Sequence, residues 1–218
     1  MEENEFERLK VSGANVQRGT QYKDIKVAGA SKFVNDIECN IFKTSGVVKS
    51  EGSIKAKVFK VAGAVKIVGS LDAPEISASG GVKVGKDITT ETAAFGGSIY
   101  VGGKLSAKEL HVDGTICIKG ELLVDRFELH MGGKSELTEV YGDQVTIRKN
   151  WSFGITAPRH ANIGLIEATT IDISHTTCKR VSGDTVVIGD GCVIDLVEYS
   201  TSITVNKKAK VKEQVKID

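Results

Sequence analysis

The sequence predicts an all-β fold, a single-stranded parallel β-helix with three sides, and two observations predict it. One apolar position recurs along the chain at almost constant spacing. Within each repeat, apolar residues fall in pairs two apart, which is typical of a strand with one buried face. A constant period of this kind indicates a solenoid whose units bury their apolar sides by stacking. We therefore expect about 12 coils of 17–18 residues, and a rod ~58 Å long because stacked strands lie ~4.8 Å apart.

The recurring position can be followed through the chain in six steps of 17, then steps of 18, 18, 18, 16 and 18. Its members are Ile25, Phe42, Phe59, Ile76, Ala93, Leu110, Phe127, Val145, Ile163, Val181, Val197 and Val215. We interpret the unbroken series as one domain, residues 1–218, because a boundary would reset the phase. Within it we expect a short acidic tail over 1–8, regular 17-residue coils over 9–141, and looser coils over 142–218 with an insertion near 150–162.

Each repeat divides into sides of 6, 6 and 5 residues. In one coil the three apolar pairs begin at Leu71, Ile76 and Val82. Glycines mark a corner between the first and second sides, and we expect a positive φ at these positions: Gly29, Gly46, Gly63, Gly80, Gly97, Gly114 and Gly132. A helix is excluded, because pairs two apart form no stripe of period 3.6. Right-handed coils are expected from the general preference of parallel crossovers.

Composition excludes several classes of function. With 29 basic and 28 acidic residues the net charge is about +1, so nothing global attracts nucleic acid or an anionic membrane. The four cysteines have no CxxC spacing and are expected to be free thiols; Cys39 shares the inward phase, whereas Cys117 points outward with no basic partner in view. The acidic first residues resemble no signal peptide, and no run reaches the ~20 apolar residues of a membrane helix. We expect a cytoplasmic protein.

No catalytic, cofactor-binding or metal-binding residues are predicted, and the chain is not expected to be an enzyme. The histidines His111, His130, His160 and His175 follow one another at separations of 19, 30 and 15, which match no single coil. His111 and His130 are one coil plus two residues apart, compatible with neighbouring positions on one face, but we interpret them as surface residues. The glycine-rich segments 79–87 and 95–104 do not fit the phosphate-binding pattern GxxxxGK[ST] and belong to the corners.

The repeat blocks VFKVAGAVKIVGSLDAPEISASGGVKVGKDI and LHVDGTICIKGELLVDRFEL resemble the bactofilins, bacterial polymer-forming cytoskeletal proteins, over roughly residues 25–140. The resemblance implies right-handed triangular β-helices that join end to end into filaments without nucleotide and act as scaffolds in cell shape, cell-wall-enzyme placement and motility. It implies as partners the chain itself, a paralogous bactofilin and cell-wall or motility proteins. The sequence departs from the family in its 2 prolines and acidic start, so we expect no strong membrane anchor and membrane association only through partners.

Solenoid physics leads to the same expectation, because the end strands of a solenoid without caps are templates for strand addition. Our hypothesis places the polymer contacts at Leu9, Val11, Val16, Val211, Val215 and Ile217. Glutamates crowd the N-terminal end and lysines the other, which favours head-to-tail joining, whereas the family's nonpolar mode would press like charges together. Salt screens exposed charges beyond ~8 Å, so both modes stay open.

Two rival hypotheses belong to other classes. Enzymes of the left-handed β-helix type, acyltransferases or carbonic anhydrases, also have three-sided coils, but they keep a strict hexapeptide rhythm of 18, and the long run of steps of 17 counts against them. The second rival is a monomeric adaptor that presents its flat faces to a partner.

Overall fold

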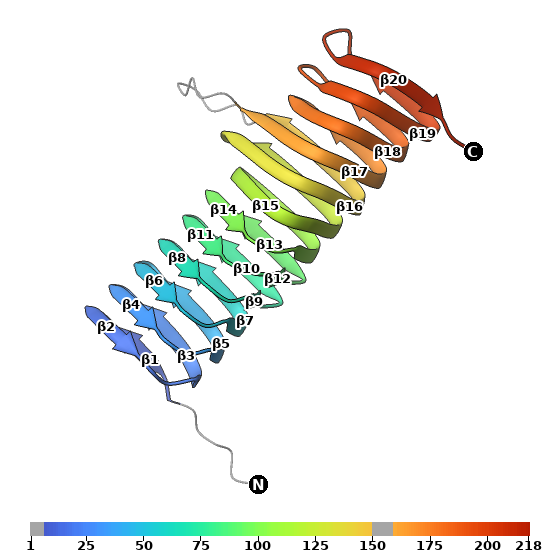
Figure 1. Cartoon of the computed structure of the whole chain (residues 1–218). Coiled ribbons are helices and arrows are strands. Elements are labelled where there is room, and N and C mark those ends of the chain that lie inside the picture. The colour runs from blue at the N-terminus through green and yellow to red at the C-terminus, as the bar shows by residue number, and fades with distance from the viewer. Residues whose placement is uncertain (1–6, 150–158) are drawn as a thin grey trace.

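The computed structural model describes residues 7–149 and 159–218. In these residues all regular secondary structure is strand, and the coils stack side by side into an elongated rod with β1 at one tip and β20 at the other (Figure 1). The strands are β1 (Leu9–Val11), β2 (Ala14–Gln17), β3 (Gln21–Val27), β4 (Ala30–Phe33), β5 (Ile37–Thr44), β6 (Val47–Ser50), β7 (Ile54–Val61), β8 (Ala64–Ile67), β9 (Leu71–Asp72), β10 (Glu75–Ala78), β11 (Gly81–Val84), β12 (Ile88–Thr89), β13 (Thr92–Phe95), β14 (Ser98–Val101), β15 (Leu105–Met131), β16 (Lys134–Lys149), β17 (His160–Ile173), β18 (Thr176–Ile188), β19 (Val193–Val205) and β20 (Lys210–Lys216).

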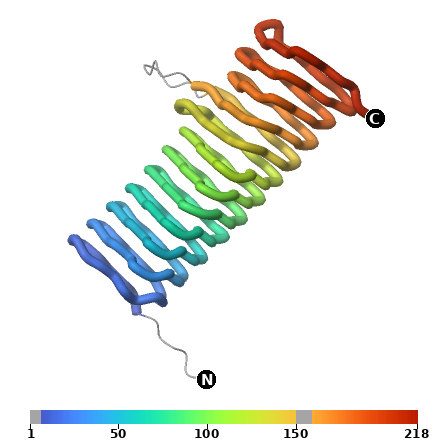
Figure 2. The backbone as a smooth tube through the Cα atoms, in the orientation of Figure 1, coloured from blue at the N-terminus to red at the C-terminus, as the bar shows by residue number. Residues whose placement is uncertain are grey.

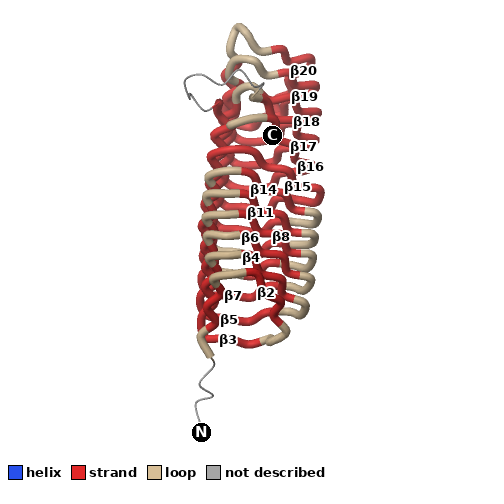
Figure 3. The backbone as a smooth tube through the Cα atoms, turned by 90° about the vertical axis from the view of Figure 1, so that its left-hand side faces the viewer, coloured by secondary structure: helices blue, strands red, loops and turns tan. Residues whose placement is uncertain are grey.

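The coils are three-sided, as the apolar pairs predict. One coil consists of β9, β10 and β11, and the next of β12, β13 and β14, each strand pairing in parallel with its counterpart one coil on. From β15 onward the strands run continuously through the corners, so that the loops between sides become fewer (Figure 3). No helix among the described residues is long and apolar enough to span a membrane.

The core is one continuous column along the inside of the rod. In the β9–β11 coil the inward residues are at most 4% exposed: Leu71, Ala73, Ile76, Ala78, Val82 and Val84. The residues between them point outward and are exposed or half-buried. Burying a large apolar side chain contributes roughly 1.5–3 kcal/mol, and each coil buries its share only against its neighbours.

From Ile25 the register steps by 17 through much of the rod, where the coils look alike (Figure 2). Ile25 pairs with Phe42, and the ladder continues in the same steps to Leu110. Phe127 then pairs with Val145, one position later than a step of 17. The predicted recurring position is correct up to this point.

Beyond Val145 the predicted column is wrong except at one step, where Val181 pairs with Val197 as predicted. Val145 pairs with Ile171 rather than with Ile163, so the coil between them is much longer than those before it. The next coil is short, because Ile171 already pairs with Val186. The extra length lies between β16 and β17 and includes residues 150–158, which fall outside the described residues, as does most of the predicted 150–162 insertion. The sequence misled because all three sides carry apolar pairs, so a frame displaced by one side still meets an apolar residue.

The glycine corners also differ from the prediction. In the described part of the chain only Gly114 of this column has a positive φ, at 156°. The glycines are explained by close approach instead: a Cβ at Gly63 would lie 2.0 Å from the carbonyl oxygen of Gly46, one coil earlier. Gly46 itself meets the carbonyl oxygen of Gly29 in the same way, at 1.9 Å. The corner therefore needs glycine because the stacked backbones leave no room for a side chain.

Candidate functional site

The C-terminal tip, formed by β20 and the end of β19, exposes part of the core. β20 pairs with β19 in parallel, and no other described strand pairs with its remaining edge. Val211 stacks on the fully buried Ile194. The apolar side chains here are only partly buried although they pack on the core: Tyr199, Ile203, Val205, Ala209 and Val211. This tip offers both strand-pairing groups and an apolar surface.

The N-terminal tip, formed by β1 and β2, is similar on one side and polar on another. Leu9 pairs with Ile25 and Val11 with Val27, so both continue inward columns. Leu9 is partly buried, and Val11 is 5% exposed. On β2, Gln17 lies opposite the buried Phe33. No described strand pairs with the outer edges of β1 and β2.

The six predicted contact residues thus divide into two groups. Leu9, Val11 and Val211 continue the core column. Val16, by contrast, is 52% exposed and lies opposite Lys32 on the outward face. Val215 lies opposite Glu198, not opposite Val197 as the predicted column requires. Ile217 is 38% exposed and its N–H donates to the carbonyl oxygen of Tyr199.

All four cysteines are free thiols, as the sequence predicts. Cys39, Cys178 and Cys192 are buried, and burial raises the pKa of Cys39 and Cys178 to about 12 and that of Cys192 to about 11. Cys117 is half-buried. Lys119 is a basic neighbour of Cys117 that the sequence analysis missed. Its pKa is raised, first by the electrostatic interaction with Cys117 and then by a hydrogen bond to Glu136.

Four titratable side chains meet on the outward face of β15, and we call them the histidine–carboxylate cluster: His111, Asp113, Glu128 and His130. His111 and Asp113 are two residues apart on one strand segment, and Glu128 and His130 lie opposite them one coil on. His111 contacts Glu128 through Nδ1 (3.2 Å to Oε2) and Asp113 through Nε2 (2.9 Å to Oδ2). His130 contacts Asp113 through Nδ1 (2.9 Å to Oδ1) and Glu128 through Nε2 (3.0 Å to Oε1). The four groups form a closed ring in which histidines and carboxylates alternate.

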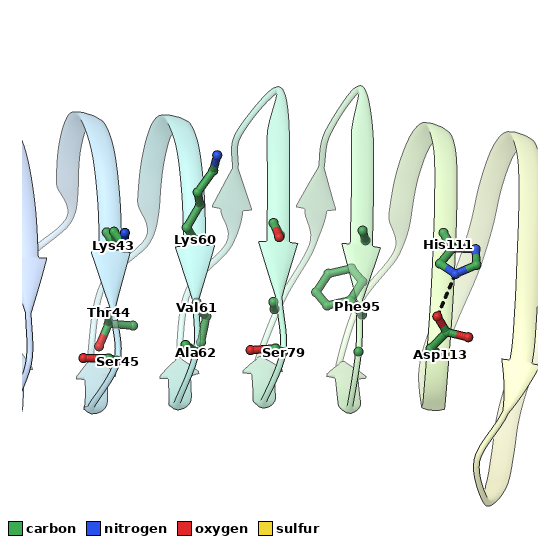
Figure 4. A pocket seen from close by; sticks show the side chains of 14 residues that line it. Lys43, Thr44, Ser45, Lys60, Val61, Ala62, Ser79, Phe95, His111 and Asp113 are labelled. Carbon is green, nitrogen blue, oxygen red and sulfur yellow. Dashed lines mark hydrogen bonds and ion pairs between the residues drawn. The ribbon is translucent and has the colours of Figure 1, made fainter. Parts of the chain in front are cut away.

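The cluster borders a shallow hollow on the same face of the rod. The hollow extends over successive coils from Lys43 to His111, and small residues such as Ser79 are part of its lining (Figure 4). In Figure 4 the imidazole of His111 points toward the carboxylate of Asp113. The four side chains of the cluster are themselves partly exposed to solvent.

The ring of contacts changes proton affinities within the cluster. Burial lowers the pKa of His111, but hydrogen bonds to Asp113 and Glu128 and the charges of both outweigh it, so the pKa lies above its ordinary value. The hydrogen bond from His111, with a second from His130, outweighs burial at Asp113 and holds its pKa below the ordinary value. Both ring nitrogens of each histidine face carboxylate oxygens, and a neutral imidazole can donate a hydrogen bond through only one of its two nitrogens.

The other two histidines lie apart from this cluster. His160 Nε2 is 2.8 Å from Thr177 Oγ1, and burial, followed by the charges of His175 and Lys134, lowers the pKa of His160. His175 occupies a turn with φ of 50°. The sequence analysis found His111 and His130 compatible with neighbouring positions on one face, interpreted them as surface residues, and missed the two carboxylates. The signal was the pair of segments HVD (111–113) and ELH (128–130), one coil apart.

Comparisons with known proteins leave the function open. No family model matches the chain, and no solved structure matches it significantly. The chain is similar to the uncharacterized protein YhbE of Bacillus subtilis (strain 168), with 40% identity over 53 residues. The match covers 24% of this chain and 22% of that protein, so the chain spans about a fifth of the length of the relative that it matches.

Proposed function

We propose that the protein is a non-enzymatic scaffold that assembles end to end into filaments without nucleotide. The observation that carries the proposal is the C-terminal tip, where no described strand pairs with the outer edge of β20 and the neighbouring apolar side chains are only partly buried. Backbone N–H and C=O groups on such an edge pair readily with another strand. A second molecule placed there continues the stacking that holds each coil to the next.

The apolar residues at the tips add to the strand pairing. Val211 at one tip and Leu9 at the other each cover an inward column from one side only. Full burial of a valine or leucine side chain contributes roughly 1.5–3 kcal/mol. Several such residues at a tip, together with backbone hydrogen bonds, would stabilise a contact between two molecules at their tips.

The cellular part of the proposal rests on the resemblance of the repeat blocks to the bactofilins. We propose a cytoplasmic filament that organises cell-shape, cell-wall or motility machinery. Its partners are further copies of this chain, a paralogous bactofilin and the proteins of that machinery, and it reaches the membrane through such partners.

Electron microscopy of the purified full-length protein tests the assembly. The buffer contains a chelator and no nucleotide, and the protein is treated with a nucleotide-hydrolysing enzyme beforehand. We expect long filaments as wide as one rod. Fibre diffraction from aligned filaments should give a reflection near ~4.8 Å along the filament axis, because strands that cross the axis stack at that spacing.

Three outcomes would overturn the proposal. A monodisperse monomer at high concentration would point to an adaptor that binds through its flat faces. A discrete trimer would point to the left-handed β-helix enzymes. Filaments without the axial reflection would show that the molecules join by their sides.

A further inference from the structure

The histidine–carboxylate cluster has the donor set of a transition-metal site. His111 Nδ1, a carboxylate oxygen of Glu128 and His130 Nε2 converge on one another within 4.8 Å. Each of the two histidine nitrogens lies close to Glu128, at 3.2 and 3.0 Å. Ligand atoms that share a zinc ion at ~2.0–2.2 Å lie roughly 3–3.5 Å apart in a tetrahedral arrangement. The two nitrogens approach different oxygens of Glu128, and the three ligand atoms lie within 4.8 Å of one another, so a small inward movement brings them to the spacing of a shared ion.

Asp113 occupies the position of a supporting carboxylate. Its two oxygens lie 2.9 Å from His111 Nε2 and 2.9 Å from His130 Nδ1, the nitrogens that face away from Glu128. Histidines that bind a metal usually donate their other N–H to a carboxylate, which fixes the tautomer and the ring orientation. Asp113 accepts from both rings, so the lone pairs of His111 Nδ1 and His130 Nε2 are oriented toward Glu128.

The charges of the cluster also fit a divalent ion. Two neutral imidazoles and two carboxylates together carry two negative charges, which an ion of the zinc class balances. The side chains are 33% (His130) to 46% (Asp113) exposed, so an ion can reach them from solvent.

We propose that His111, Glu128 and His130 bind one divalent transition-metal ion of the zinc class, with Asp113 as the residue that positions both histidines. Two imidazoles and one carboxylate leave a fourth position open to water or to a side chain of a partner. The ligands come from two successive coils, so the ion clips one coil to the next on the outer face of the rod.

The charged groups around the site set its dependence on pH. Glu109 and Arg126 line a second hollow, which also includes His111 and Glu128. Arg148 lies opposite His130 on β16 and pairs with Asp172. Protons compete with the metal for the histidine nitrogens, so affinity falls as the pH is lowered.

Equilibrium dialysis of the tag-free full-length protein against Zn²⁺ tests the site, with bound metal measured by mass spectrometry. We expect one zinc per chain. His130→Gln and Glu128→Gln should abolish that equivalent, whereas the matched control His160→Gln, which removes a histidine outside the cluster, should retain it. Co²⁺ in place of zinc should give the intense visible absorption of a four-coordinate ion in the wild type and in the control.

Asp113→Asn separates positioning from ligation. The variant should keep the stoichiometry and the Co²⁺ spectrum but bind about 10–100-fold more weakly, as loss of a supporting carboxylate does. Glu128→Asp retains the charge but withdraws the carboxylate, and should weaken binding without changing the far-UV circular dichroism. The proposal fails if the wild type binds less than one equivalent, or if His130→Gln and Glu128→Gln bind as the wild type does. The measurement counts metal per chain in filaments and monomers alike, so its outcome is independent of the assembly proposal.

Discussion

Phe59 stacks on Phe42 one coil along the rod, with ring centroids 5.1 Å apart and ring planes inclined by 19°. Both side chains are fully buried. Offset aromatic pairs contribute ~0.5–1.5 kcal/mol beyond the burial of their area. Phe33 meets Phe42 at a tilted angle of 58° from another side of the triangle. Aromatic contacts inside the N-terminal half of the rod therefore fix one coil over the next.

Phe59→Ala should destabilise the rod by about 3–5 kcal/mol, because it removes a large buried side chain and leaves a cavity. The midpoint of urea unfolding, followed by circular dichroism, measures the change. Phe59→Leu retains most of the volume and should cost distinctly less. A loss well below the expected range for the alanine variant would contradict the stacked core.

Gly63→Ala should destabilise the protein by about 1–3 kcal/mol, the range for overpacking, because its Cβ would meet the carbonyl oxygen of Gly46 at 2.0 Å. Gly81→Ala is the matched control, since its Cβ would have only Ser98 Oγ nearby, at 3.5 Å. The control should be neutral or stabilise by up to ~1 kcal/mol through the unfolded chain. Thermal melts of the two variants give the comparison, and equal melting temperatures would refute steric contact at the corner.

The fold class could be predicted from the sequence because period and pairing are local properties of a solenoid. Leu71, Ile76 and Val82 mark three buried sides within a single short stretch, and every coil up to Phe127 repeats them. The register beyond Val145 could not be predicted in this way. One overlong coil and one shortened coil change the phase, but apolar pairs on all sides hide the displacement from a search for one column.

The candidate sites were only partly visible in the sequence. Val211 and Leu9 could be placed at the tips, since both continue an apolar column to the end of the described strands. Val215 could not, because a side chain's inward or outward phase depends on its pairing partner, here Glu198. The cluster around His111 was not predicted because two spacings bring its members together. Residues on the same strand segment are two positions apart, and residues on neighbouring coils are one full coil apart. A search for histidines that repeat with the coil misses carboxylates placed between them.

In the metal-free protein, the cluster should stabilise the fold most between about pH 4 and pH 6.5. The pKa of His111 is raised from 6.5, so its contribution is complete below pH 6.5 and is lost as the pH rises through the raised value. The pKa of Asp113 is lowered from 3.8, so its contribution is present above that value and is lost as the pH falls through the lowered one. The stability difference between wild type and His111→Gln should therefore shrink as the pH rises above the raised pKa of His111.

Urea midpoints of the chelator-treated proteins measure that difference, and imidazole NMR should give His111 a titration midpoint above 6.5. For His160→Gln the stability difference from the wild type should change with pH in the opposite direction. The pKa of His160 is lowered from 6.5, so its contribution is present above pH 6.5 and is lost as the pH falls through the lowered pKa. Parallel pH profiles for the two variants would refute the charge arrangement of the cluster.

Val211→Asp should block assembly at the C-terminal tip, because its carboxylate would enter the apolar contact over Ile194 without a partner. Burying an unpaired charge costs several kcal/mol, and each ~1.4 kcal/mol weakens association about tenfold. Lys210→Asp is the control: it places the same charge on the same strand at an exposed, outward position. We expect filaments from the control, and filaments of wild-type length from Val211→Asp would exclude this tip as a contact.

A second variant, Leu9→Asp, blocks the N-terminal tip by the same reasoning and reveals the polarity of joining. If molecules join head to tail, each variant alone stays a monomer of 23.3 kDa, and an equimolar mixture forms dimers through the one intact pair of tips. If like tips join, each variant forms dimers by itself through its intact tip, and mixing adds nothing.

Light scattering coupled to size-exclusion chromatography distinguishes these patterns. The charge asymmetry between the ends favours the first, and the resemblance to the bactofilins favours the second. The Val211→Asp variant alone distinguishes the two modes. If it is a monomer, molecules join through unlike tips; if it is a dimer, they join through like tips.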